Sequence, residues 1–237
     1  MNIVEEPNRY YKINPIRMAN DAKIKGVKAP LPDFYNHFMI ICGKPGSGKS
    51  TWWLNMLTKK NKTKSTYYGK FDRVEIFSNS LKTITSKIHL PEERLHHGID
   101  DLESVVQDIA ENTEEGDKTL LVLDDVASDL KHKEKDFLEK LVWNRRHTGG
   151  GITIWLCVQV FNSVDMKLRK NISHIIIWNT SNKQELESIY KNTINMDRDK
   201  FYELLRYVYK DKHDFLFIDL DTRTYYRNFN KLVFNAD

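Results

Sequence analysis

A glycine-rich segment, ICGKPGSGKS at residues 41–50, holds the residues whose types and spacing most clearly suggest chemistry. It matches the phosphate-loop pattern G-x-x-x-x-G-K-[ST] from Gly43 to Ser50. Glycines let the backbone curl so that successive N–H groups face one point, and a following helix adds its positive end there. We expect Lys49 to reach the β- and γ-phosphates of a nucleotide and Ser50 to ligate Mg²⁺. The expected nucleotide-binding residues are Gly43, Lys44, Pro45, Gly46, Ser47, Gly48, Lys49, Ser50 and Thr51.

Two neighbouring carboxylates follow a later apolar run, TLLVLDDV at residues 119–126. Such a run predicts a buried strand that delivers Asp124 and Asp125 to the carboxyl edge of a sheet, where ligands of parallel-sheet folds bind. We expect Asp124 to hold the metal ion through Ser50 and water, and Asp125 to orient or deprotonate an attacking water. The alternative for Asp125 is a loop cap, because neighbouring side chains along a strand face opposite sides.

Three further polar residues are candidates for catalysis, each with a plain alternative. Gln159 ends the apolar run 152–159 and is a neutral donor that could sense the γ-phosphate or position water, or simply a surface residue. Arg145 and Arg146 end a predicted helix, where the helix dipole favours cations. They are also candidates for an arginine finger that enters a neighbouring subunit's nucleotide site.

The elements that must position these residues alternate between apolar runs and longer amphipathic segments, a pattern typical of a parallel sheet covered on both faces. Asp100 and Glu103 have the spacing of a capping box at the start of one helix. The runs 215–220 and 224–227 predict a C-terminal hairpin within about 214–228. Strands are expected over 37–42, 71–78, 119–126, 152–159 and 174–179, and helices over 49–60, 100–112, 134–147, 166–171, 182–192 and 197–210.

The predicted fold is therefore α/β, a P-loop NTPase core with its helices around the sheet and a C-terminal β-hairpin. Numbered along the chain, the five parallel strands are expected in the order 5-1-4-3-2, because the fourth fits the gap between the first and third. Four of the six prolines fall in the first 32 residues, and proline keeps a chain extended. We predict an extended N-terminal arm over residues 1–33 and an NTPase domain over 34–237.

Composition excludes several other classes of protein. The 237 residues carry a net charge of +4, with 40% apolar and 30% charged residues, as expected for a globular domain rather than a disordered chain. The longest apolar runs are shorter than the roughly 20 residues that span a bilayer, and no secretion signal is visible, so an intracellular protein is expected. Cys42 and Cys157 lie too far apart for a CxxC motif and are expected to be buried, reduced thiols.

Taken together, the motifs resemble one family. The order GKPGSGKS, LLVLDD, RRH and then CVQVFNSVDMKLRKNISHIIIWNTS is similar to the FtsK-HerA superfamily of P-loop motors. Within it, the small size and the paired aspartates resemble the poxvirus-type DNA-packaging ATPases of large double-stranded DNA viruses. The resemblance covers about residues 37–192. It implies ATP and Mg²⁺ as cofactors, and a ring of five or six subunits that threads double-stranded DNA into a preformed capsid.

The resemblance also implies roles and surroundings. Carried over by position, Lys49 and Ser50 bind phosphate and Mg²⁺, Asp124 binds the metal, Asp125 activates water, Gln159 is the sensor, and Arg145 or Arg146 is the finger. Many members of the wider superfamily have Glu in place of Asp125, and Arg169 is a third candidate finger. Implied partners are DNA, further copies of the chain, and capsid or portal-like proteins. The implied location is the host cytoplasm, a viral factory or the virion.

Contacts with DNA are predicted only in outline. Between Gly43 and Phe71 the chain has seven lysines and no acidic residue, which suits phosphate backbones as well as it suits a solvated loop. Three more basic residues that could contact DNA lie after the fourth predicted strand, 152–159. Trp52, Trp53, Tyr67 and Tyr68 could stack on bases or on adenine, although we expect the two tryptophans to pack in the core. The candidate DNA contacts are Lys44, Lys49, Lys59, Lys60, Lys62, Lys64, Lys70, Lys167, Arg169 and Lys170.

Three other functions remain open from the sequence. A helicase or a DNA pump of the same superfamily would use the same motifs. A nucleoside or nucleotide kinase also begins with this loop, although it needs an arginine-rich lid that the sequence lacks. A non-hydrolysing ATP-binding assembly protein would keep the loop and release no phosphate.

Overall fold

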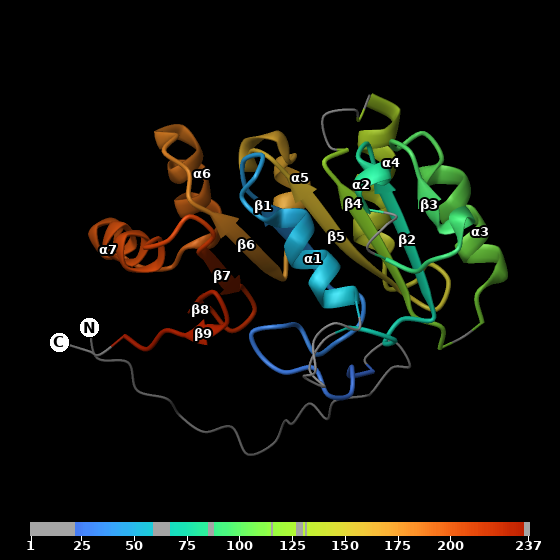
Figure 1. Ribbon diagram of the computed structural model, residues 1–237, viewed down its shortest axis with the longest axis horizontal. Coiled ribbons are helices and arrows are strands. Elements are labelled where there is room, and N and C mark those ends of the chain that lie inside the picture. The colour runs from blue at the N-terminus through green and yellow to red at the C-terminus, as the bar shows by residue number, and fades with distance from the viewer. Residues whose placement is uncertain are drawn as a thin grey trace, which may run out of the picture.

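The computed structural model describes residues 22–58, 67–84, 88–114, 116–126, 130 and 132–234. Within these residues the strands form a single sheet in the order β3-β2-β4-β5-β1-β6-β7-β8-β9 (Figure 1). The strands are β1 (Phe38–Cys42), β2 (Arg73–Ser78), β3 (Leu95–His96), β4 (Thr119–Asp124), β5 (Ile152–Val158), β6 (His174–Trp178), β7 (Phe215–Asp219), β8 (Thr224–Arg227) and β9 (Asn230–Lys231).

The order of the five long parallel strands confirms the prediction, since 5-1-4-3-2 corresponds to β6-β1-β5-β4-β2. Their registers pair Cys42 with Val158 and Asp124 with Cys157, so β1, β4 and β5 end at the same edge. The predicted hairpin is β7 and β8, and β7 pairs antiparallel with β6. The hairpin therefore extends the central sheet.

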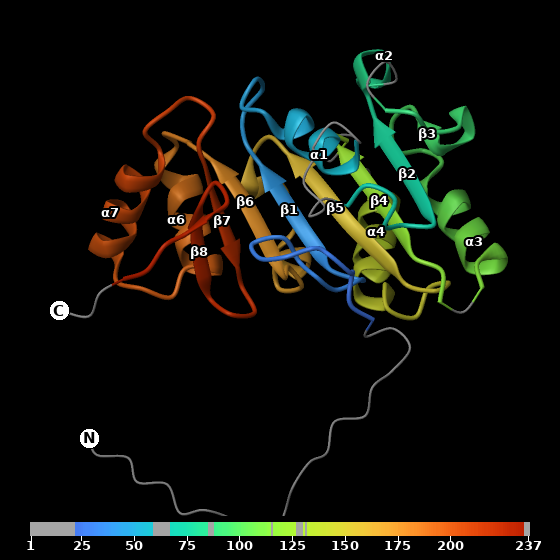
Figure 2. The same cartoon turned by 60° about the horizontal axis from the view of Figure 1, so that its bottom comes forward.

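Helices cover both faces of the sheet, because fully buried strands present apolar side chains alternately to each side. Met39 and Ile41 face α1, whereas Phe38 and Ile40 face the core formed with α3 to α7. Figure 2 shows α1 on one side of the sheet and α4 and α6 on the other. The helices are α1 (Lys49–Leu57), α2 (Leu81–Ile84), α3 (Leu102–Asn112), α4 (His132–Asn144), α5 (Met166–Arg169), α6 (Lys183–Thr193) and α7 (Arg198–Val208), with 3-10 turns η2 (Glu92–Arg94) and η3 (Phe161–Ser163).

The predicted capping box is wrong. Helix α3 begins at Leu102 after Asp101, and the side chain of Asp101 makes no capping hydrogen bond. The physical reason is a buried turn: Ile99 and Leu102 are both in the core, and the Leu102 N–H donates to the Ile99 carbonyl. Apolar anchoring thus fixes where this helix starts.

The N-terminal segment packs against the domain as far as the structure describes it. Residues 1–21 of the predicted arm lie outside the described residues. Ile24, Val27 and Leu31 are buried in the same core as α1. The boundary at residue 33 therefore remains a prediction. Among the described residues, no helix combines the length and the apolar character needed to cross a membrane.

Candidate active site

The phosphate loop, residues 43–48, joins β1 to α1 at the carboxyl edge of the parallel strands. Gly48 has φ 118° directly before Lys49, a left-handed conformation that other residues rarely adopt. A Cβ on Gly43 would lie 2.6 Å from Ser47 Oγ and 3.0 Å from Trp178 Cβ, so a larger residue there would crowd the turn. The glycines of the motif therefore allow the tight turn that leads into the N-terminus of α1, the positive end of its dipole.

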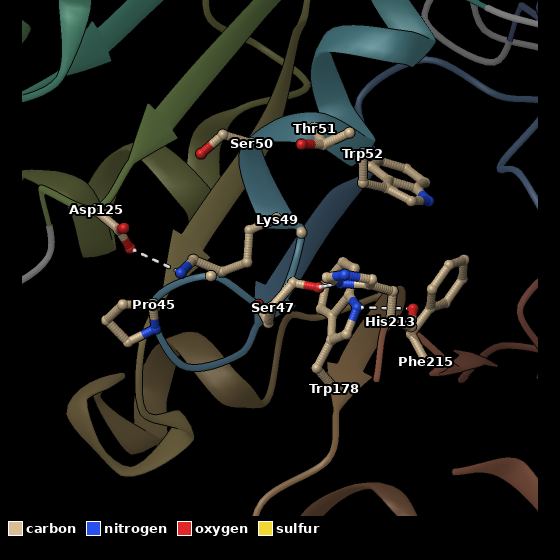
Figure 3. Close-up of a pocket in the computed structure, with 12 residues that line it drawn as sticks. Pro45, Ser47, Lys49, Ser50, Thr51, Trp52, Asp125, Trp178, His213 and Phe215 are labelled. Atoms are coloured by element: carbon tan, nitrogen blue, oxygen red, sulfur yellow. Dashed lines mark hydrogen bonds and ion pairs between the residues drawn. The ribbon is translucent and has the colours of Figure 1, made fainter. Parts of the chain in front are cut away.

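Lys49 lies between this loop and the end of β4. Its side chain is 4% exposed, and Nζ donates a hydrogen bond to the Gly43 carbonyl at 2.8 Å. Nζ also forms an ion pair with Asp125 Oδ1 at 3.4 Å (Figure 3). The amine is thus held at the phosphate loop by two oxygen atoms of the protein.

Ser50 and Asp124 form the second part of the site. Asp124 is 2% exposed at the end of β4, and Ser50 Oγ donates to its Oδ2 at 3.0 Å. Burial raises the pKa of Asp124, the Ser50 hydrogen bond opposes this rise, and the neighbouring Asp125 charge adds to it. A hydroxyl and a carboxylate are the hard oxygen ligands that Mg²⁺ prefers, and a buried carboxylate needs a cation. The pair therefore fits the predicted metal site.

Asp125 also lies at the phosphate loop, beside Lys49, even though it follows Asp124 directly in the chain. Its φ is 55°, and its N–H donates to the Cys157 carbonyl at 3.2 Å. This left-handed turn removes the alternation of a strand, so both carboxylates lie beside the loop. Aspartate and asparagine adopt the conformation more readily than longer residues. That preference gives a physical reason for Asp where many relatives are expected to have Glu.

Gln159 comes immediately after β5, the strand between β1 and β4. The Gly43 N–H donates to the carbonyl of Val158 at 3.0 Å, so the residue before Gln159 touches the phosphate loop. The Gln159 side chain is exposed. It therefore lies at the correct edge of the sheet for the predicted sensor.

The two candidate finger arginines lie at the opposite edge, because α4 ends where β5 begins. Arg145 Nε donates to the Asn36 carbonyl at 2.7 Å, and its Nη1 donates to the Val142 carbonyl at 2.6 Å. Burial and the adjacent Arg146 lower the pKa of Arg145 to about 10, so it stays charged at neutral pH. Arg146 is exposed. Neither arginine belongs to the cleft around Lys49.

The third candidate, Arg169, is held within its own segment. Its Nε donates to the Val164 carbonyl at 2.8 Å, and its guanidinium lies 4.7 Å from the centre of the Phe161 ring. Of the candidate DNA contacts nearby, Lys167 pairs with Glu139, whereas Lys170 is exposed. Lys59, Lys60, Lys62 and Lys64 lie outside the described residues.

A cleft of about 560 Å³ contains the loop and Asp125, and it also has a wall that the sequence pattern did not indicate. That wall is formed by Trp178, His213 and Phe215. Trp178 ends β6 beside β1, so its position was available from the predicted strand order. His213 and Phe215 lie just before and at the start of β7, which pairs antiparallel with β6. No sequence motif indicates that these residues reach the phosphate loop. Trp52 and Trp53 are buried as predicted, and Trp52 also lines the cleft.

Beneath the loop, the buried Glu185 links three segments of the site. Its Oε1 accepts from the Phe161 N–H at 2.6 Å and from the Cys42 thiol at 3.7 Å, and its Oε2 accepts from Thr180 Oγ1 at 2.7 Å. Cys42 is the last residue of β1, and Phe161 lies two residues after Gln159. Glu185 therefore connects the end of β1 to the residues that follow β5. Both cysteines are free and buried, as predicted.

The parallel sheet in this order, with the phosphate loop after β1 and the aspartate pair Asp124 and Asp125 at the end of β4, defines a P-loop NTPase fold. A family model described as Poxvirus A32 protein matches residues 33–218, and the chain belongs to this family. The match is longer than the expected 37–192 and extends into β7. A search of curated proteins finds no match.

Solved structures show the same fold. The DNA-packaging ATPase of Sulfolobus turreted icosahedral virus is 15% identical, with a TM-score of 0.56 over 81% of this chain and 97% of that one. The genome packaging NTPase of Sulfolobus turreted icosahedral virus 2, in complex with ATP-gammaS, is 20% identical, with a TM-score of 0.57 over 83% and 98%. The pCW3 conjugation coupling protein TcpA is 14% identical, with a TM-score of 0.52 over 85% and 61%.

Proposed function

We propose that this protein hydrolyses ATP in the presence of Mg²⁺ and uses the energy to translocate double-stranded DNA while a viral genome is packaged into a capsid. The observation that carries this proposal is the meeting of Lys49 and Ser50 with Asp124 and Asp125 at one edge of the sheet. The family and the packaging enzymes with the same fold support the choice of DNA as the partner.

Each residue has a definite task in hydrolysis. The loop N–H groups and the Lys49 amine bind the β- and γ-phosphates and offset the charge that develops in the transition state. Ser50 and Asp124 would hold Mg²⁺, which neutralises phosphate charge when bound. Asp125 orients the attacking water and accepts its proton, since its side chain lines the cleft beside Lys49. Gln159 supplies a neutral donor at the same edge.

Assembly completes the proposed site. We infer a ring of five or six copies, in which an arginine from one subunit enters the cleft of the next. We favour Arg146 for this task because its side chain is exposed, whereas Arg145 is half-buried. DNA phosphates would meet the lysines between residues 59 and 64 and Lys170. We place this work in the infected host cell, at a capsid or portal-like vertex.

Displacement of a DNA triplex tests translocation. A third strand bound near one end of a linear duplex is released when a motor moves along the duplex. We expect release that needs ATP, Mg²⁺ and Lys49. A helicase would instead separate a forked duplex, a kinase would phosphorylate a nucleoside, and an assembly protein would release neither phosphate nor third strand. Any of these three results in place of triplex release would contradict the proposal.

A further inference from the structure

The cleft extends beyond the phosphate loop, on the side away from Asp125, to a wall of rings. Trp178, His213 and Phe215 form this wall, opposite the start of α1 (Figure 3). None of the groups assigned to phosphate, metal or water lies there. If the phosphates of a bound nucleotide occupy the loop, its sugar and base must lie elsewhere in the cleft. The wall of rings is the part of the cleft next to the loop that has no role assigned so far.

The wall is tied to the phosphate loop by hydrogen bonds. The Trp178 indole N–H donates to the His213 carbonyl at 3.1 Å, and His213 Nδ1 lies 3.0 Å from the Ser47 carbonyl. Because a carbonyl only accepts, Nδ1 is the protonated nitrogen of this ring. The Phe215 ring lies 5.2 Å from the Trp178 ring. The three rings therefore keep a fixed position relative to the loop.

The segment before β7 is itself anchored. Asp214 accepts hydrogen bonds from the N–H groups of Lys210 and Asp211 at 3.1 and 2.9 Å. Arg227 and Asn228 donate to the same carboxylate from the β8 side at 2.7 and 2.8 Å. The antiparallel strands thus hold His213 against the loop.

The members of the wall differ in exposure. His213 is exposed, whereas Trp178 and Phe215 are 3% and 7% exposed. Trp52 also lines the cleft, and its ring packs against Trp155 and Phe217 in the core. The planar, apolar face of a heteroaromatic base suits such a wall of rings.

We propose that the wall formed by Trp178, His213 and Phe215 binds the nucleobase. This proposal rests on the proposed ATP site at the phosphate loop. It gives the antiparallel extension of the sheet a direct part in nucleotide binding. Stacking of a base on an aromatic ring contributes about 1–3 kcal/mol, which corresponds to a change of about 5- to 150-fold in affinity.

Calorimetric titration of the full chain with ATP and with inorganic tripolyphosphate, both with Mg²⁺, tests the proposal. Tripolyphosphate occupies the loop but has no base. We expect wild type to bind ATP at least fivefold more tightly than tripolyphosphate. Trp178→Leu should weaken ATP binding by the same factor and leave tripolyphosphate binding unchanged, and Trp178→Phe should restore most of it. Trp143→Leu, at an exposed tryptophan of α4, is the matched control and should change neither affinity.

If wild type binds ATP and tripolyphosphate equally tightly, the proposed nucleobase site is wrong, and no variant is needed to show it. The same conclusion follows if Trp178→Leu weakens both ligands equally, since the tryptophan then only supports the loop. If wild type binds neither ligand, the proposed ATP site itself is wrong, and the proposed nucleobase site is rejected with it.

Discussion

The Nζ of Lys49 lies 3.4 Å from Oδ1 of Asp125, so the amine proposed to bind phosphate forms an ion pair with the carboxylate proposed to activate water. Strands β2 and β3 and helix α3 separate the two residues in the chain, and they meet because β1 and β4 lie on either side of β5 in the sheet. Phosphate oxygens at the loop compete with Asp125 for this amine. A bound nucleotide would therefore draw Lys49 away and leave Asp125 free to accept a proton.

The backbone of Asp125 predicts an unusual order among its variants. At φ 55°, asparagine is tolerated about as well as aspartate, whereas a longer side chain costs about 1–2 kcal/mol. We expect Asp125→Asn to fold with the stability of wild type, bind ATP and lose turnover about 100-fold or more. We expect Asp125→Glu to be less stable than Asp125→Asn. Thermal unfolding and phosphate release measure both, and a fully stable, fully active Asp125→Glu would refute the left-handed turn.

The buried carboxylate of Asp124 should lower the stability of the protein at neutral pH, even though we expect turnover to need it. Its raised pKa means that the folded protein holds this proton more tightly than the unfolded chain does. Its stabilising contribution is therefore complete below the unfolded pKa of about 3.9 and is lost as the pH rises through the raised value. Asp124→Asn should increase Tm at neutral pH, by an amount that shrinks on acidification, while Mg²⁺-dependent turnover is lost. A lower Tm at neutral pH would contradict this.

Alanine variants of Arg145 and Arg146 should differ in thermal stability and in turnover. Arg145→Ala removes two hydrogen bonds to backbone carbonyls, so we expect a lower Tm. Arg146 is exposed, so Arg146→Ala should lower Tm less than Arg145→Ala does, keep ATP binding, and lose turnover about 1,000-fold or more as an assembled ring.

Mixing subunits tests whether the finger acts between copies. A ring that contains both Arg146→Ala and Lys49→Ala subunits has some sites with an intact Lys49 beside a neighbour's intact Arg146. Turnover should therefore return on mixing two inactive variants. No recovery from rings shown to be mixed, or normal turnover by the double variant of Arg145 and Arg146, would exclude the finger.

We expect Glu185 to act as a positioning residue, because it accepts from the N–H of Phe161, two residues after Gln159. Glu185→Ala leaves the Phe161 N–H without its acceptor, and we expect kcat to fall about 10- to 100-fold while the KM for ATP changes little. Glu185→Gln retains an acceptor and should restore most of kcat. If Glu185→Ala changes only Tm, or if glutamine does not rescue, the residue is structural and nothing more.

The central sheet was predictable because its strands are long apolar runs that obey the rules of parallel crossovers. The two-residue strand Leu95–His96 was not, since it is defined by pairing with β2 and has no pattern of its own. The phosphate loop and the aspartates are local motifs, and their positions follow from where strands end. His213 reaches the loop from 166 positions away through an antiparallel return, so only the folded chain reveals it.

The most direct test of the account is ATP turnover by the full chain with and without double-stranded DNA, with particle mass determined in the same buffer. We predict that wild type assembles, that DNA increases its turnover, and that Lys49→Ala lowers turnover about 100-fold or more. Lys200→Ala, at an exposed lysine of α7, should behave as wild type. A persistent monomer whose turnover ignores DNA, or full turnover by Lys49→Ala, would contradict the account.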